Sequence, residues 1–258
     1  MENDFWHVHS DFLTSDPSRL VKSLFDDDTK NYERAKTELS NDVILLGDAI
    51  TLFVTSLQGG YQKQEEWKDN ISVKASVAMA NSTLNYLLLA RHAVLFGYFP
   101  EGRDLLRSCH ERITRSYLFF IDNSKAKEFL SGKEILQSDV DNKIAALLKV
   151  DESLRKMLRN SYRFQSSLVH PNLDSLSIRT AGSPSEDLKH RIVKYPIFGG
   201  MVSPDIGKLS LYAVIQMALL ASKVIGVMFV ETSGTWSKEY DRILQKYEIV
   251  LDQVKELK

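Results

Sequence analysis

Hydrophobic residues recur along most of the chain at alternating intervals of three and four, the spacing that places side chains on one side of an α-helix. Downstream of Lys30 this series comprises Leu39, Val43, Leu46, Ile50, Phe53 and Leu57. A second series, within 72–96, comprises Val73, Val77, Ala80, Leu84 and Leu87. Both stripes predict long amphipathic helices, and each helix requires a helical partner to cover its apolar side.

Similar patterns predict further helices over about 101–121, 124–130, 139–149, 152–169, 205–231 and 237–257. Residues 1–28 are expected to form an N-terminal arm with one short helix, which begins at Pro17. Glycine and proline interrupt helices, so Gly59 with Gly60 are expected to end the first long helix and Gly97 the second. Pro100 and Gly102 are expected to mark the turn that follows Gly97. The pattern indicates an all-α protein, a multi-helix bundle of long antiparallel helices in one domain, 1–258.

Residues 171–204 are the least helical part of the sequence and are expected to form a mostly non-helical insertion. In one interpretation, 176–180 and 192–197 pair as a small hairpin, although Pro196 interrupts the second run.

Composition narrows the classes of partner. Twelve glycines and six prolines in 258 residues are fewer than average proteins contain, which favours long helices. The net charge of −1 gives no overall field that would attract nucleic acid or an anionic membrane, so an RNA partner requires a local basic patch. Gln216 and Lys223 interrupt the most apolar segment, 209–230, which predicts a buried helix and no membrane partner. With Cys109 as the single cysteine, no internal disulfide forms and a cytoplasmic location is expected.

One stretch, YRFQSSLVHPN at 162–172, has a pattern typical of catalysis. Arg163 and His170 are seven residues apart, which on a helix places them on one face with Ser167 between them, and Pro171 ends that helix. A guanidinium binds phosphate through two hydrogen bonds and an imidazole transfers a proton near neutral pH. The pair therefore predicts metal-independent cleavage of RNA, in which the ribose 2′-hydroxyl is the nucleophile.

The same stretch resembles the Arg-x4-6-His motif of the HEPN superfamily of helical nucleotide-binding domains. The earlier segment LLRSCHERITRSYLFF, with Arg107 and Glu111, is similar to a helix of uncharacterised bacterial families and of AbiV-like abortive-infection proteins. These resemblances imply a homodimer in which Arg and His of two protomers line a ribonuclease cleft, and a role in cellular defence. Phe164 departs from the polar residue that HEPN ribonucleases usually place after the arginine, which puts catalysis in doubt more than the fold.

Chance also produces such a spacing. With thirteen arginines and six histidines, one Arg-to-His match of this kind is expected at random, and a second one exists at Arg103 and His110. The alternative hypothesis is therefore a noncatalytic helical protein-interaction module in which Arg163 and His170 are structural.

The remaining candidates are binding residues. Arg107 and Glu111, four residues apart, form either a surface ion pair or a row that faces and orients the helix of Arg163 and His170, and Arg115 extends this row as a phosphate contact. Ser167 is a further candidate contact. No phosphate loop, dinucleotide fingerprint or zinc-ligand set occurs, so no nucleotide cofactor and no metal are expected.

Overall fold

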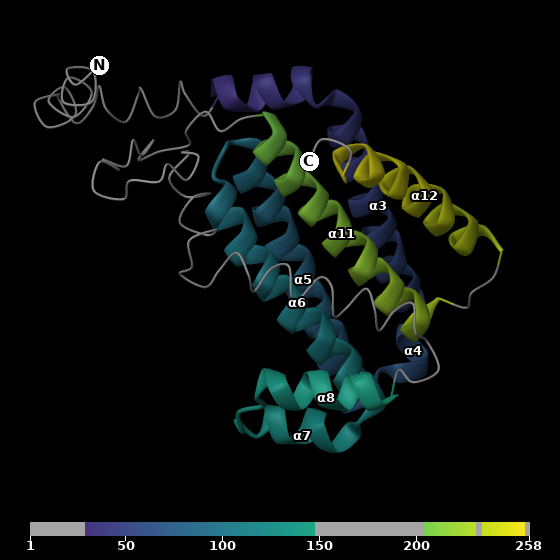
Figure 1. Cartoon of the computed structure of the whole chain (residues 1–258). Helices are drawn as coiled ribbons and strands as arrows, with labels where there is room; N and C mark the ends of the chain where they lie inside the picture. Colours follow the sequence, from purple (N-terminus) through teal and green to yellow (C-terminus); the bar gives the residue numbers. More distant parts are fainter. Residues whose placement is uncertain (1–28, 148–203, 231–233, 256–258) are drawn as a thin grey trace, which may run out of the picture.

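The chain folds into a bundle of long helices, as the computed structural model in Figure 1 shows. The structure describes residues 29–147, 204–230 and 234–255, and these contain helices and no strand. A helical stretch, 29–38, precedes α3. The elements that follow are α3 (Ser40–Gln62), α4 (Gln64–Trp67), α5 (Ile71–Leu95), α6 (Phe99–Ile121), α7 (Asn123–Leu130), α8 (Gln137–Leu147), α11 (Pro204–Phe229) and α12 (Thr235–Lys255). The predicted all-α fold is confirmed.

Helices α5 and α6 form an antiparallel hairpin along the length of the bundle. Polar contacts between two pairs of residues define the register of this hairpin. Ser76 and Ser116 each donate to the other's backbone carbonyl, at 2.6 and 2.8 Å, and the Cys109 thiol lies 3.7 Å from the carbonyl of Thr83. Cys109 is fully buried. These contacts give partners to polar atoms inside two closely packed helices.

The turn between α5 and α6 agrees with the sequence-based expectation at Gly97 and differs from it at Pro100 and Gly102. It is made by Gly97, whose φ of 89° lies in the left-handed region that favours glycine. Pro100 lies in the first turn of α6, where its missing N–H costs nothing, and Gly102 lies inside the helix. A Cβ at 102 would be 2.7 Å from Cγ2 of Val94, so this glycine allows close packing of the hairpin.

Helix α3 also continues through the glycines that were expected to end it. Gly59 and Gly60 are helical, and α3 ends at Gln62. A Cβ at these two positions would be 3.3 Å from Val230 and 3.2 Å from Phe229. The prediction was wrong because these glycines bring α3 close to the end of α11.

The core is built around α11, which packs on α3, α5 and α6. It runs parallel to α6, since a Cβ at Gly207 would lie 3.6 Å from the Phe99 ring, and Phe229 packs against Phe120 with ring centroids 5.4 Å apart. Nearly every residue of α11 from Ser210 to Ile225 is buried, which confirms the buried helix predicted there.

Two of the described helices are long and apolar enough to cross a membrane, namely 40–62 and 207–229. Inside the bundle, half of the apolar window of the first and 83% of that of the second are buried. Core helices of this length pass the same test of length and composition.

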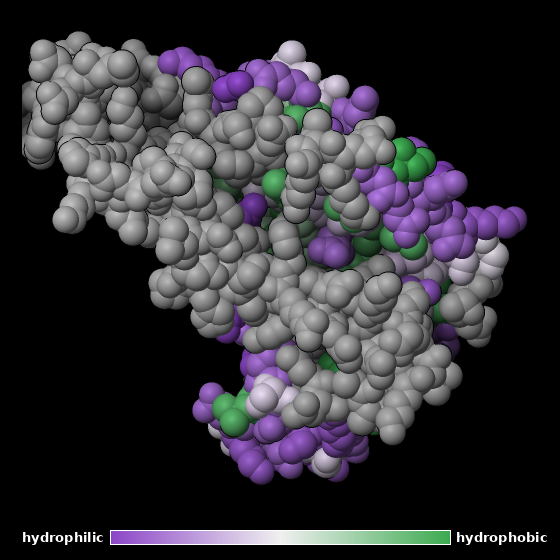
Figure 2. All heavy atoms as spheres, viewed as in Figure 1, coloured by the Kyte–Doolittle hydropathy of each residue, from purple (hydrophilic) through white to green (hydrophobic). Residues whose placement is uncertain are grey.

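Short helices cover the far end of the α5–α6 hairpin. Asp122 caps α7 by accepting hydrogen bonds from the backbone N–H groups of Ser124 and Lys125, at 3.0 and 3.2 Å, and it pairs with Lys143 of α8. Figure 2 shows mainly hydrophilic side chains on the visible surface of α7 and α8 and of α12. The predicted N-terminal helix, the 152–169 helix and the 171–204 insertion lie outside the described residues, except for Pro204, which begins α11.

Candidate functional site

One side of α6 carries a polar row, defined as Arg103, Arg107, His110 and Thr114. Intervals of four, three and four residues place these side chains above one another along the helix. The row lies beside the α6 residues that pack on α11, such as Phe99 and Phe120. It therefore brings together, on one helix, the second Arg-to-His match of the sequence and part of the predicted binding row.

The second match is sealed in the protein. Arg103 is 4% exposed and His110 is 1% exposed. Burial lowers the pKa of Arg103 to about 10, so its guanidinium remains charged at neutral pH. Burial lowers the pKa of His110 to about 4, so its imidazole is neutral there. A neutral, inaccessible imidazole is a poor proton donor to a phosphodiester, which argues against this pair as the catalytic one.

The guanidinium of Arg103 is an unusual buried group. Within the part of the chain that the structure describes, its Nε and Nη1 atoms make no hydrogen bond. A buried donor without an acceptor costs about 1–3 kcal/mol, and more when it is charged. An oxygen acceptor brought to this side of α6 would therefore gain a strong interaction.

Arg107 and Glu111 form the ion pair that their spacing predicted, with Nε of Arg107 3.2 Å from Oε1 of Glu111. Their side chains are 32% and 25% exposed. A pair at this spacing and exposure contributes about 0.3–0.5 kcal/mol to stability. Its larger effect is to hold the Arg107 guanidinium in one orientation while leaving it partly open to a ligand.

Near the C-terminal end of the polar row, two hydrogen bonds connect α6 to the start of α8 and to the segment before it. Nη2 of Arg115 donates to the backbone carbonyl of Ile135 at 3.3 Å, and the amide nitrogen of Gln137 donates to the hydroxyl of Thr114 at 3.1 Å. Nε of Arg115 is buried and makes no hydrogen bond among the described residues.

The sequence reasoning did not single out Thr114 or Gln137. Thr114 could have been found, because it is seven residues after Arg107 and shares its face. Gln137 could not, because its role depends on how the chain returns to α6.

Arg163, Ser167 and His170 lie outside the described residues. Among the described residues, no three His, Cys, Asp or Glu side chains are placed to hold a metal ion.

Comparison with known proteins does not identify a family for this chain. No family model, no curated protein sequence and no solved structure matches the chain. The HEPN-like and AbiV-like resemblance rests on the quoted motifs and stays a prediction.

Proposed function

We propose that this protein binds RNA and acts as a metal-independent endoribonuclease of the HEPN-like kind. The observation that carries the proposal is the arginine content of one helix: among the described residues, Arg107 of α6 has one carboxylate partner, Glu111, and Arg115 has none. Both side chains are half-buried, and Nε of Arg115 makes no hydrogen bond there. Guanidinium groups bind phosphate in a planar, bidentate way, so these two arginines suit a phosphodiester backbone, whereas Arg103 is enclosed by the protein.

In this proposal Arg107 and Arg115 bind the RNA backbone, with Ser167 as a further contact, while Arg163 and His170 act on the scissile phosphate. The 2′-hydroxyl attacks phosphorus and gives up its proton to solvent, and the bond from phosphorus to the 5′-oxygen breaks. Protonated His170 gives its proton to that leaving oxygen. The products are a 2′,3′-cyclic phosphate and a 5′-hydroxyl, and no cofactor takes part.

Cleavage of labelled single-stranded RNA in EDTA tests the chemistry. The purified chain is expected to produce fragments that end in cyclic phosphate, and His170→Ala is expected to lower the rate at least 100-fold, because general acid catalysis contributes about 10²- to 10⁴-fold. Unchanged cleavage by His170→Ala would show that the activity does not belong to this site.

RNA binding by α6 has a matched control in the chain itself. Arg34 and Glu38 form another ion pair at spacing four, with 37% and 43% exposed side chains, on the helical stretch 29–38. Arg107→Ala is expected to weaken RNA binding and to reduce the slope of log K against log salt by about one unit, whereas Arg34→Ala leaves both unchanged. Equal effects of the two substitutions would exclude a specific role for Arg107.

The resemblance also implies a homodimer, which multi-angle light scattering would detect as twice the 29.4 kDa chain mass. A monomer that still cleaves RNA would contradict a shared cleft. Location in the cytoplasm and a role in cellular defence belong to the same proposal, and toxicity that His170→Ala abolishes in expressing cells would support them.

The second candidate function is a noncatalytic protein-interaction module. The burial of Arg103, His110 and Thr114 favours it, because three of the four residues of the polar row are enclosed by the protein. Under this function Arg163→Ala lowers the melting temperature and there is no RNA cleavage to lose. Retained stability together with lost cleavage would instead support the ribonuclease.

A further inference from the structure

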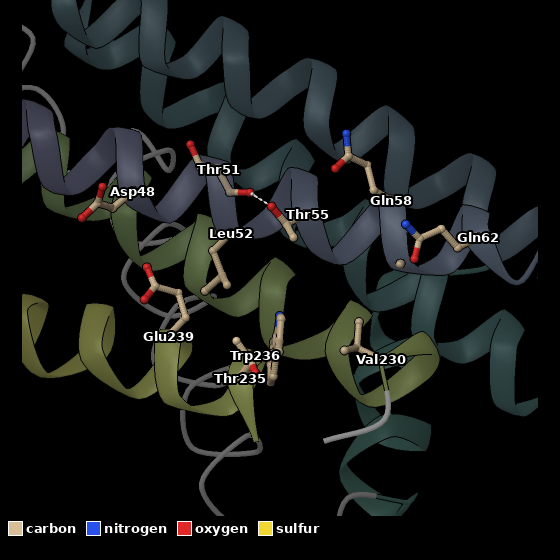
Figure 3. Close-up of a pocket in the computed structure, with 11 residues that line it drawn as sticks. Asp48, Thr51, Leu52, Thr55, Gln58, Gln62, Val230, Thr235, Trp236 and Glu239 are labelled. Carbon is tan, nitrogen blue, oxygen red and sulfur yellow. Dashed lines mark hydrogen bonds between the residues drawn. The ribbon is translucent and has the colours of Figure 1, made fainter. Parts of the chain in front are cut away.

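A pocket of about 530 Å³ lies along α3, beside the first turns of α12 and the end of α11 (Figure 3). On α3 it is lined by Asp48, Thr51, Thr55, Gln58 and Gln62. These residues follow one another at intervals of three and four, so they form one side of the helix over roughly 21 Å. The volume is in the range of about 300–1,000 Å³ that small-molecule sites occupy.

Trp236 of α12 projects toward α3 at the centre of this pocket (Figure 3). Its Nε1 donates to the hydroxyl of Ser56 at 2.9 Å, and one ring face stacks on Tyr240 with centroids 5.3 Å apart. Its benzo edge lies against Gly226, where a Cβ would be only 2.5 Å away. These three contacts hold the indole in place, and Tyr240 covers one face of the ring, while Trp236 lines the pocket.

Hydrogen-bonding groups line the pocket on both sides of the indole. The carboxamides of Gln58 and Gln62 are exposed and make no side-chain hydrogen bond within the described residues, so their donors and acceptors are open to a ligand. Each amide offers two N–H donors and a carbonyl acceptor. An amide of this kind can pair with the edge of a nucleobase through two hydrogen bonds.

The charges of the pocket select against anions. Among the described residues that line it, Asp48 and Glu239 are charged and no lysine or arginine occurs. Arg242 holds these two carboxylates, with Nη2 3.2 Å from Asp48 and Nε 2.8 Å from Glu239, and Nζ of Lys246 lies 3.7 Å from Asp48. Neither cation lines the pocket, so the charged groups on its wall are carboxylates. Carboxylate oxygens accept N–H groups and repel phosphate.

We propose that this pocket binds the base of a free nucleoside. The ring of the base stacks on the indole of Trp236 where it lines the pocket, because every base has a π-face that an aromatic side chain can stack on. Its polar edge pairs with Gln58 or Gln62, and the adjacent carboxylates exclude the phosphorylated form. The pocket is formed by α3, α11 and α12, whereas the proposed RNA site is on α6, so either assignment can fail without the other.

Isothermal titration calorimetry of the full chain tests this site with adenosine, guanosine, cytidine and uridine, each beside its 5′-monophosphate. At least one nucleoside is expected to bind, and its monophosphate at least tenfold more weakly. The double variant Gln58→Ala/Gln62→Ala is expected to lose tenfold or more in affinity, while Gln245→Ala, an exposed glutamine of α12 outside the pocket, binds like the original chain.

All three glutamines are exposed, so these variants keep the fold, and circular dichroism verifies this. Absence of heat with all four nucleosides would overturn the assignment. So would a nucleoside affinity that the double variant leaves unchanged. Tighter binding of a monophosphate, or of a short single-stranded RNA, than of the nucleosides would overturn the choice of a free nucleoside.

Discussion

Gly226 in α11 is the position where adding one methyl group should disturb the fold most clearly. It lies opposite the Trp236 indole, and an alanine Cβ there would be 2.5 Å from both Cζ2 and Cη2 of the ring. Carbon atoms in van der Waals contact prefer a separation of about 3.5–4.0 Å. Gly226→Ala therefore requires the indole, and the start of α12 that carries it, to withdraw by about 1 Å.

The free-energy change follows from what this withdrawal affects. The hydrogen bond from Trp236 to Ser56, 2.9 Å long, stretches beyond its useful range, and the stack on Tyr240 shifts. Overpacking of a core costs about 1–3 kcal/mol, and a rigid indole lies toward the upper value because it cannot change rotamer easily. Alanine regains about 1 kcal/mol over glycine through helix propensity. The net loss of stability is about 2 kcal/mol.

Gly47 of α3 supplies the matched control. It is also inside a long helix, but it is exposed, and a Cβ there meets no atom within 4 Å. Gly47→Ala should raise the free energy of unfolding by about 0.5–1 kcal/mol. The same substitution thus has opposite signs at two helical positions, and urea denaturation followed by circular dichroism would measure a difference of roughly 3 kcal/mol between them.

Equal stability of the two variants would refute the close approach of α11 to Trp236. A loss in Gly226→Ala that persists when Trp236 is replaced by leucine would also refute it, because the smaller side chain removes the clash. A loss that shrinks in the double variant would support it, as expected for two residues in contact.

Three further predictions concern buried polar groups. Burial lowers the pKa of His110 from 6.5 to about 4, so the unfolded chain takes up a proton more readily than the folded one, and the free energy of unfolding should fall by up to about 3 kcal/mol as the pH drops from 6.5 to 4. Urea midpoints should show that His110→Leu lacks this part of the loss. An identical pH profile of the variant and the original chain would contradict the prediction. Burial raises the pKa of the Cys109 thiol, so a disulfide reagent should label it in urea but not in the native protein, and rapid native labelling would exclude this burial. The hydroxyl of Tyr212 donates to Oδ1 of buried Asp42 at 3.0 Å, so Tyr212→Phe should lower the free energy of unfolding by about 1–3 kcal/mol. Tyr61→Phe, at an exposed tyrosine, should change the free energy of unfolding little. Equal effects of the two substitutions would show that the buried hydrogen bond is unimportant.

Much of the fold was predictable from the sequence because the spacing of apolar residues along the chain determines where an amphipathic helix forms. The predicted helix at 72–96 is observed as α5 (Ile71–Leu95), and those at 124–130 and 205–231 as α7 and α11. Scarce glycine and proline allowed these helices to be long. The burial of Cys109 was also predictable, since its spacing from Leu105 and Ile113 places it on the apolar face of α6.

The candidate site was predictable in part. The spacing of Arg107 and Glu111 gave their ion pair, because both partners are on one helix. The contacts of Thr114 with Gln137 and of Arg115 with Ile135 join separate segments, and no local pattern encodes them. The deep burial of Arg103 and His110, which lowers both pKa values, likewise depends on what packs against α6.

The position of each helix and its apolar side follow from local spacing, because both depend on a period of 3.6 residues. The role of the glycines depends on packing between helices. Gly59, Gly60 and Gly102 were expected to interrupt helices, yet each lies within a helix at a close approach to another residue, as Gly226 does. The physical reason is that a glycine ends a helix or admits a neighbour according to what packs against it, and that partner is distant in the chain.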